Sequence, residues 1–284
     1  MRRFRHIVQE VLCSNWLITE QAHCAIQAIL ASRLGMTAQE WQAAKREGTD
    51  ISGNEVDLPQ MTIKDGVAEI PVAGVILQGA APWEKGSGAV STEDIEADLV
   101  EAMSDDRCKG IFLDFDSPGG SVGGIPELGD LVAQINAKKP VMSYINGGMD
   151  SGALWLGIGA GEIVARDRMT SVGSIGVYMP WMDRTEEFAQ KGRKVELIVN
   201  EGADLKGMGY PGTSLSKSQR EHLQERANKI GVMFRDHVEK HRGPMDDNLF
   251  RGQSFDAEDV VGDLVDSIAP RAVALAEFKG TLGT

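Results

Sequence analysis

The chain has 284 residues, which suits one large domain or one domain with appendages. Its hydrophobic content of 42% and charged content of 25% are ordinary for a folded globular protein and argue against wholesale disorder. The 29 basic and 42 acidic side chains give a net charge of −13. This acidic balance argues against a nucleic-acid-binding protein, because phosphate binding requires clustered Lys and Arg.

Residues 1–58 are interpreted as an N-terminal helical arm followed by a linker. The basic start resembles the first region of a signal peptide, but Gln9 and Glu10 interrupt the apolar stretch and no cleavage site follows. No run reaches the ~18 apolar residues of a membrane span. The three cysteines form neither a metal-ligand spacing nor an even disulfide framework. Together these features predict a cytoplasmic protein without a membrane anchor.

Within the arm, Thr19 can cap a helix whose apolar residues recur at helical spacing as far as Leu34, and Gly35 then ends it. A second short helix is predicted over residues 37–46. The stretch 48–59 is polar and contains Gly, Asn and Pro, so we interpret it as the linker.

Residues 59–284 are predicted to form one domain, with an α/β core over 60–212 and a C-terminal helix and tail over 213–284. Short apolar runs bounded by Gly, Pro or charges are typical of strands that are buried on both faces. Helical patterns lie between these runs, one beginning at Ser91 and one over 125–137, and such alternation predicts an α/β fold. The predicted strands are Val67–Ile70, Val72–Leu77, Gly110–Phe115, Val141–Ile145, Glu162–Ala165, Ile175–Tyr178 and Val195–Val199.

A long amphipathic helix is predicted from near Ser216 to Gly243–Pro244. It carries His237 and His241 four residues apart, a spacing that can indicate a metal site. No acidic residue completes an HExxH pattern, so we interpret these histidines as part of a solvated helix face and expect no metal.

Three glycine- and serine-rich segments in the core could carry chemistry. In the first, Gly119 and Gly120 follow a strand and can bring backbone N–H groups close to a ligand oxygen, although a tight turn explains them equally well. In the second, Ser151 opens a buried helix and is either a simple N-cap or a nucleophile. In the third, Ser174 lies at the entry to a strand and could orient a neutral lysine amine.

A nucleophilic serine needs a base, and the five histidines lie outside the α/β core. A lysine can take this role if burial lowers its pKa, since desolvation penalises the charged form. Lys206 is the lysine that we select, because it lies in a glycine-flanked loop after a predicted strand. On local grounds a solvated loop lysine explains it as well.

The order of these segments resembles the signal peptide peptidase A family of serine proteases, within the superfamily of the Clp protease and crotonase. The similarity covers residues 67–266. Its motifs, in chain order, are Ser117–Gly120, Ser151–Gly152, Gly173–Val177, Gly202 and Lys206. The start of the arm, Asn15–Glu20, and the stretch Lys206–Pro211 resemble the phage branch, the prohead or capsid-assembly proteases. In place of the usual small residue, Asp150 precedes the serine, which bears on substrate preference.

This resemblance implies a Clp protease/crotonase-like repeated ββα core with the N-terminal helical arm and the C-terminal helical segment. It also implies acyl transfer, in which Ser151 attacks a peptide carbonyl and Lys206 acts as general base and then general acid. Gly119 and Gly120 would supply the oxyanion hole and Ser174 would hold the lysine, without a metal or cofactor. The expected substrates are scaffold, capsid or portal proteins, in the host cytoplasm or within a phage prohead.

A family member with one repeat is expected to form a homo-oligomeric ring, in which Ser151 of one subunit faces Lys206 of the next. Three alternatives remain open. The chain could be a bacterial peptidase that degrades cleaved signal peptides, a crotonase-like acyl-CoA enzyme, or a non-catalytic structural protein of the phage head. A crotonase-like enzyme would have no need of the pair formed by Ser151 and Lys206.

Overall fold

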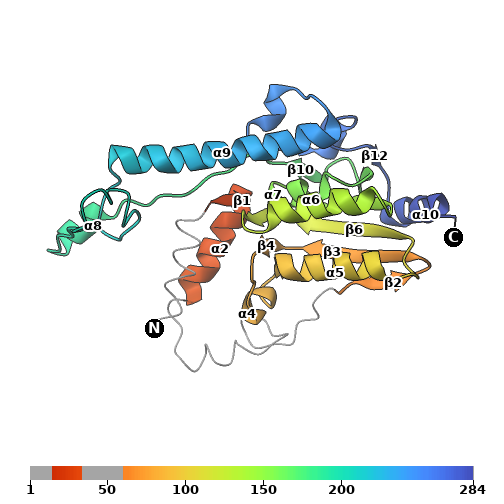
Figure 1. The fold of residues 1–284 in the computed structure, drawn as a ribbon, viewed down its shortest axis with the longest axis horizontal. Helices are drawn as coiled ribbons and strands as arrows, with labels where there is room; N and C mark the ends of the chain where they lie inside the picture. Colours follow the sequence, from red (N-terminus) through yellow and green to blue (C-terminus); the bar gives the residue numbers. More distant parts are fainter. Residues whose placement is uncertain (1–14, 34–59, 284) are drawn as a thin grey trace. The chain divides into compact units, whose positions relative to one another are not determined.

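The computed structural model describes residues 15–33 and 60–283 (Figure 1). The predicted helix over 37–46 and the linker over 48–59 lie outside these residues. The chain forms two compact units. Among the described residues, the larger unit comprises 17–33, 60–176 and 234–283, and the smaller one comprises 15–16 and 177–233.

A mixed β-sheet forms the centre of the larger unit and confirms the predicted α/β fold. Strands β3, β6 and β8 are parallel neighbours, and β8 pairs along the same edge with β9 at its start and with β10 at its end. The short strands β2 and β11 close the sheet by antiparallel pairing. Among the described residues its strands are β2 (Thr62–Lys64), β3 (Val67–Ala73), β6 (Gly110–Ser117), β8 (Val141–Asp150), β9 (Glu162–Ala165), β10 (Ser171–Gly173), β11 (Ser254–Asp256) and β12 (Ser267–Ile268).

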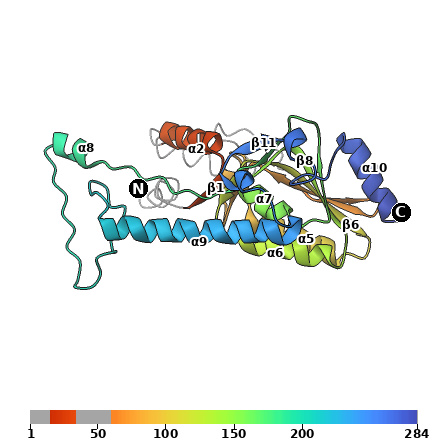
Figure 2. The same cartoon turned by 90° about the horizontal axis from the view of Figure 1, so that it is seen from above.

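Helices cover both faces of this sheet, as expected for parallel strands whose two faces are apolar. Figure 2 shows α5 (Thr92–Ser104) and α6 (Ile125–Asn136) on one face and α10 (Arg271–Thr281) on the other. On the α10 face, Phe278 packs on Phe112 of β6, which stacks on Tyr144 of β8. The predicted helices at Ser91 and over 125–137 are therefore confirmed.

A second, smaller sheet has the strand order β1–β7–β4–β5 within the described ranges. Each of its strands has three residues, and β7 consists of Gly119–Ser121, where the sequence also allowed a tight turn. The strands are β1 (Trp16–Ile18), β4 (Val75–Leu77), β5 (Ala89–Ser91) and β7, and the neighbouring short helix α4 spans Pro82–Lys85. The predicted arm helix is α2 (Glu20–Arg33), which directly follows β1.

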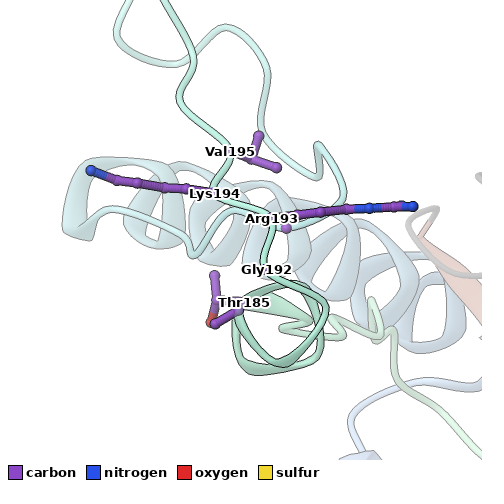
Figure 3. Close-up of a pocket in the computed structure, with 7 residues that line it drawn as sticks. Thr185, Gly192, Arg193, Lys194 and Val195 are labelled. Atoms are coloured by element: carbon purple, nitrogen blue, oxygen red, sulfur yellow. The ribbon is translucent and has the colours of Figure 1, made fainter.

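The smaller unit is mostly irregular. Trp16 and Tyr178 exchange two backbone hydrogen bonds of 2.8 and 3.2 Å. Helix α8 (Thr185–Gln190) lines a hollow of about 450 Å³ with residues 192–195 and Gly212 (Figure 3). Arg193 and Lys194 point in opposite directions there, so the hollow has no convergent polar groups that would mark a binding site.

Two predicted strands are wrong. Residues 175–178 form only an isolated bridge through Tyr178, and residues 195–199 are irregular. In the second segment Ile198 is 95% exposed. An apolar run becomes a strand only where a neighbouring strand accepts its hydrogen bonds, and residues 195–199 have no such neighbour within the described part of the chain.

Helix α9 (Lys217–Arg242) confirms the predicted long helix, and its residues from Phe234 onward belong to the larger unit. Phe234 stacks on Trp155, with ring centroids 4.7 Å apart. His237 is 7% exposed and packs against the rings of Trp155 and His241. The predicted solvated face is therefore wrong for His237, because tertiary packing rather than helix periodicity buries this turn. After α9 come the 3₁₀ turns η1 (Asp247–Phe250) and η2 (Ala257–Val260).

Acid should destabilise the protein through His237. Burial, with a smaller effect of His241, lowers the pKa of His237 from 6.5 to about 4, although Asp130 acts in the opposite direction. Between these pH values the unfolded chain binds a proton that the folded chain does not. The free energy of unfolding should therefore fall as the pH decreases from 6.5 to 4, by up to about 3 kcal/mol.

Urea unfolding at a series of pH values measures this effect. His237→Phe should flatten the pH dependence in that window, whereas replacement of the exposed His222 by Gln should leave it unchanged. An equal pH dependence in the wild type and in His237→Phe would contradict the assignment.

Candidate active site

Ser151 lies at the junction between β8 and the short helix α7 (Gly152–Gly157). Its backbone has φ 53° and ψ −115°, a conformation that is strained for any residue except glycine. Its N–H donates to Gly173 O at 2.7 Å, and its carbonyl accepts from Trp155 N at 3.0 Å. Although Ser151 occupies the N-cap position, its side chain makes no capping hydrogen bond. The geometry therefore does not support the simple cap, and it resembles the strained turn between strand and helix on which a nucleophilic serine is presented.

Gly119 lies directly against this junction. Its φ is 96°, and a Cβ at this position would lie 2.0 Å from Leu17 O, 2.8 Å from Gly152 N and 3.0 Å from Asp150 O. Gly120 lies against β4 instead, where a Cβ would be 1.8 Å from Ile76 O. Only glycine fits at either position, and Gly119 is the one whose backbone adjoins the residue after Ser151.

Gly152 supplies a second N–H group that the sequence analysis missed. As the first residue of α7, it has no intrahelical acceptor for its N–H. The sequence feature that could have identified this group is the position of Gly152 immediately after the serine, at the start of a helix. The N–H of Gly119 donates to Ser117 Oγ at 3.2 Å, and Ser117 Oγ donates to Gly74 O at 2.6 Å.

Ser174 lies beside the same junction. It follows Gly173, whose carbonyl accepts the hydrogen bond from Ser151 N, and its own N–H donates to Gln253 O at 2.8 Å. Ser174 is 6% exposed and also has a positive φ, 52°. The larger unit thus brings Ser151, Gly119 and Ser174 together from three separate segments of the chain.

Lys206 lies in the smaller unit, in a turn where its N–H donates to Ala203 O at 2.9 Å. Its side chain is exposed in the isolated chain. Ser151 and Lys206 therefore belong to different compact units, and their pairing is treated as a proposal below.

Asp150, which the sequence analysis connected only with substrate preference, is a further buried polar residue of the site. Asp150 is 4% exposed, and its carboxylate accepts hydrogen bonds from Ser171 Oγ at 2.8 Å and Ser254 Oγ at 2.7 Å. Burial raises the pKa of Asp150, and the two hydroxyl groups partly oppose this change. The carboxylate thereby ties β10 and β11 to the residue that precedes Ser151.

Removing the Asp150 carboxylate should lower the stability of the protein. Asp150→Ala leaves two hydroxyl groups without their acceptor, so we expect the free energy of unfolding to fall by about 1–3 kcal/mol. Asp150→Asn should lose less, because it keeps one oxygen acceptor. Urea unfolding measures both variants against Asp116→Ala, a change at an exposed aspartate of β6. Equal stability of Asp150→Ala and Asp116→Ala would show that the network does not stabilise the fold.

Within the ranges that the structure describes, no group of three or more His, Cys, Asp or Glu side chains could hold a metal ion. None of the helices in those ranges is both long and apolar enough to cross a bilayer.

The geometry of the site can now be compared with known proteins. The model of peptidase family S49 matches residues 133–279, slightly more than half of the chain and the part that contains Ser151, Ser174 and Lys206. The chain belongs to peptidase family S49. This finding confirms the resemblance seen in the sequence.

Two of the relatives come from phages. The chain is 30% identical to the capsid assembly protease C of Escherichia phage lambda over 209 residues, which cover 73% of this chain and 46% of that protein. It is 27% identical to the head-tail preconnector protein GP5 of Enterobacteria phage P21, over 75% of this chain and 44% of that protein. A putative protease of Methanocaldococcus jannaschii is 32% identical over 64% of this chain and 58% of its own length. The chain thus spans about half the length of the curated relatives that it matches.

Among solved structures, the comparison finds a membrane-bound stomatin-specific protease, 1510-N, with a TM-score of 0.45 and 12% identity over 74% of this chain and 83% of that one. A putative enoyl-CoA hydratase/isomerase from Acinetobacter baumannii has a TM-score of 0.46 and 12% identity, over 80% of this chain and 82% of that one.

Proposed function

We propose that this S49 chain is a serine endopeptidase of phage head maturation that cuts scaffold, capsid or portal proteins. The single observation that carries the chemistry is Ser151 itself. It stands in a strained turn without capping its helix, and the backbone of Gly119 and Gly152 adjoins it. The phage relatives, one of them a capsid assembly protease, support the biological role.

In the proposed reaction, Ser151 Oγ attacks the carbonyl carbon of the scissile peptide bond while the neutral amine of Lys206 takes its proton. The N–H groups of Gly119 and Gly152 face the developing oxyanion, provided that the Gly119 N–H turns from Ser117 Oγ to the substrate. The lysine then gives the proton to the leaving amine, and the C–N bond breaks. Water, activated by the same lysine, hydrolyses the acyl-enzyme and restores the serine. Ser174 helps to hold the lysine amine.

In the complete active site, Lys206 would come from a neighbouring subunit of a homo-oligomeric ring. One observation supports this arrangement: the smaller unit exposes three consecutive apolar residues, Leu197–Val199. Exposed apolar segments of this kind are typical of surfaces that another chain covers. A head-to-tail contact between subunits either closes into a ring or continues as a filament.

Hydrolysis of fluorescein-labelled, unfolded casein tests the proposed activity. We expect hydrolysis that continues in the presence of EDTA, because the reaction uses only side chains and backbone N–H groups. Complete loss of activity with EDTA would contradict the serine mechanism.

The head-maturation role needs a separate assay. Co-expression with the scaffold and capsid proteins encoded by neighbouring genes should yield shortened forms of at least one of them. If a signal-peptide fragment is degraded and none of the head proteins is cut, the alternative housekeeping role is favoured instead. Absence of hydrolysis of every substrate would favour the non-catalytic head protein.

A further inference from the structure

Strand β1, within the N-terminal arm, lies against the candidate active site. Leu17 O lies 2.0 Å from the position that a Cβ of Gly119 would take and 3.1 Å from the position that a Cβ of Gly152 would take. These are the two glycines whose N–H groups would face an oxyanion. The carbonyl oxygen of Leu17 therefore lies against the backbone of both glycines.

The arm is held there as a strand. Strand β1 is the neighbour of β7 in the smaller sheet, and Thr19 N donates to Pro118 O at 3.1 Å. Leu17 is 0% exposed and Ile18 is 2% exposed. Ser151 is 1% exposed, so a substrate from solution cannot reach it while the surrounding segments keep these positions.

Leu17, the central residue of β1, also has an apolar neighbour in the site. The Cβ of Leu17 lies 3.3 Å from the position of a Gly152 Cβ, and Ile125 Cδ1 lies 2.6 Å from the same position. An extended peptide with an apolar side chain at this point would make the same contacts. Main-chain pairing with an exposed sheet edge is a general mode of peptide binding, in which the side-chain pocket provides the selectivity.

We propose that residues Trp16–Ile18 are a built-in peptide ligand of this site, and that they inhibit the peptidase in cis until the arm leaves β7. The arm then also marks the preferred substrate, an extended chain with an apolar residue such as leucine at the carbonyl beside Gly119. This inference rests on the proposed function, because it takes Ser151 as the nucleophile.

Hydrolysis of labelled casein by the full chain tests the inference. Leu17→Asp places a charge in the apolar site and should release the arm. We expect the rate to rise about tenfold, which corresponds to weakening the arm's contact by about 1.4 kcal/mol. The matched control is Gln21→Asp, which introduces the same side chain at an exposed position of α2 and should leave the rate unchanged.

A second variant tests the inference independently, in case Leu17→Asp does not fold. Thr19→Pro removes the N–H that donates to Pro118 O, together with the hydroxyl group that accepts from Ala22 N at 3.4 Å, and proline is tolerated where a helix begins. It should also raise the rate. A synthetic peptide with the sequence of residues 15–20 should inhibit either activated variant, whereas the same peptide with Asp in place of Leu should not.

Failure of the inference and failure of the proposed function give different results. If the wild type, Leu17→Asp and Thr19→Pro hydrolyse casein at the same Ser151-dependent rate, the arm is not an inhibitor and the peptidase assignment stands. The arm is equally excluded as an inhibitor if the synthetic peptide does not reduce the rate. If no variant shows Ser151-dependent hydrolysis, the proposed function is wrong and the inference falls with it.

Discussion

Ser151→Ala is expected to abolish casein hydrolysis, with the rate falling by about a thousandfold or more. The reason is that the variant has no nucleophile, and loss of a serine nucleophile removes nearly all of the catalysis that depends on the whole set of active-site groups. The backbone at this position is fixed by hydrogen bonds of its N–H and C=O groups, to Gly173 and from Trp155. Alanine keeps both groups, so we expect the variant to retain its circular dichroism spectrum and its cooperative unfolding.

Ser121→Ala is the matched control for this experiment. Ser121 is a buried serine of β7, 6% exposed, and its hydroxyl group has no hydrogen-bond partner in the described structure. Its replacement should leave most of the activity. If Ser151→Ala were as active as Ser121→Ala, Ser151 would not be the nucleophile.

Lys206→Ala is expected to be nearly inactive on its own and to recover activity when mixed with Ser151→Ala. In the proposed ring, each site takes its serine from one subunit and its lysine from the next. Random mixing of equal amounts should give about a quarter of the sites both native residues. Casein hydrolysis by co-refolded mixtures should therefore approach about a quarter of the wild-type rate, while either variant alone stays near zero.

The controls for the mixing experiment are Lys194→Ala and a check of assembly. Lys194 is an exposed lysine in the same unit, and its replacement should leave the rate nearly unchanged. Native mass spectrometry should show mixed oligomers. If mixed oligomers form and the activity stays at zero, the two residues act within one chain. An active monomer would lead to the same conclusion.

Much of the larger unit could be predicted from local sequence because its elements are long and apolar. Strand β6 directly follows a charged stretch, and helix α6 shows an apolar face over three turns, so pattern and structure agree. The position of Ser151 at the start of a buried helix was predicted in the same way, from a polar residue that precedes an apolar run. Its strained backbone could not be predicted, because that conformation is set by its bond to Gly173 more than twenty residues away.

Other parts depend on partners that are distant in sequence. Strand β7 has only three residues, Gly119–Ser121, and exists because β1 and β4 lie on either side of it. The buried position of His237 depends on Trp155 in another helix. The apolar run Val195–Val199 shows the opposite case, since it has the composition of a strand and lacks a neighbour in the described chain. Local pattern therefore predicts elements well and predicts their surroundings poorly.

Strand β8 pairs with two different strands along one edge, so the sheet has two branches there. Met142–Ile145 pair with β9, which continues to β12, whereas Gly148–Asp150 pair with β10, which continues to β11. Of the two branches in the described chain, the second adjoins the candidate site, through Gly173, Ser174 and the hydroxyl group of Ser254. Substitutions in β10 or β11 are therefore expected to disturb the backbone around Ser151 more than substitutions in β9 or β12.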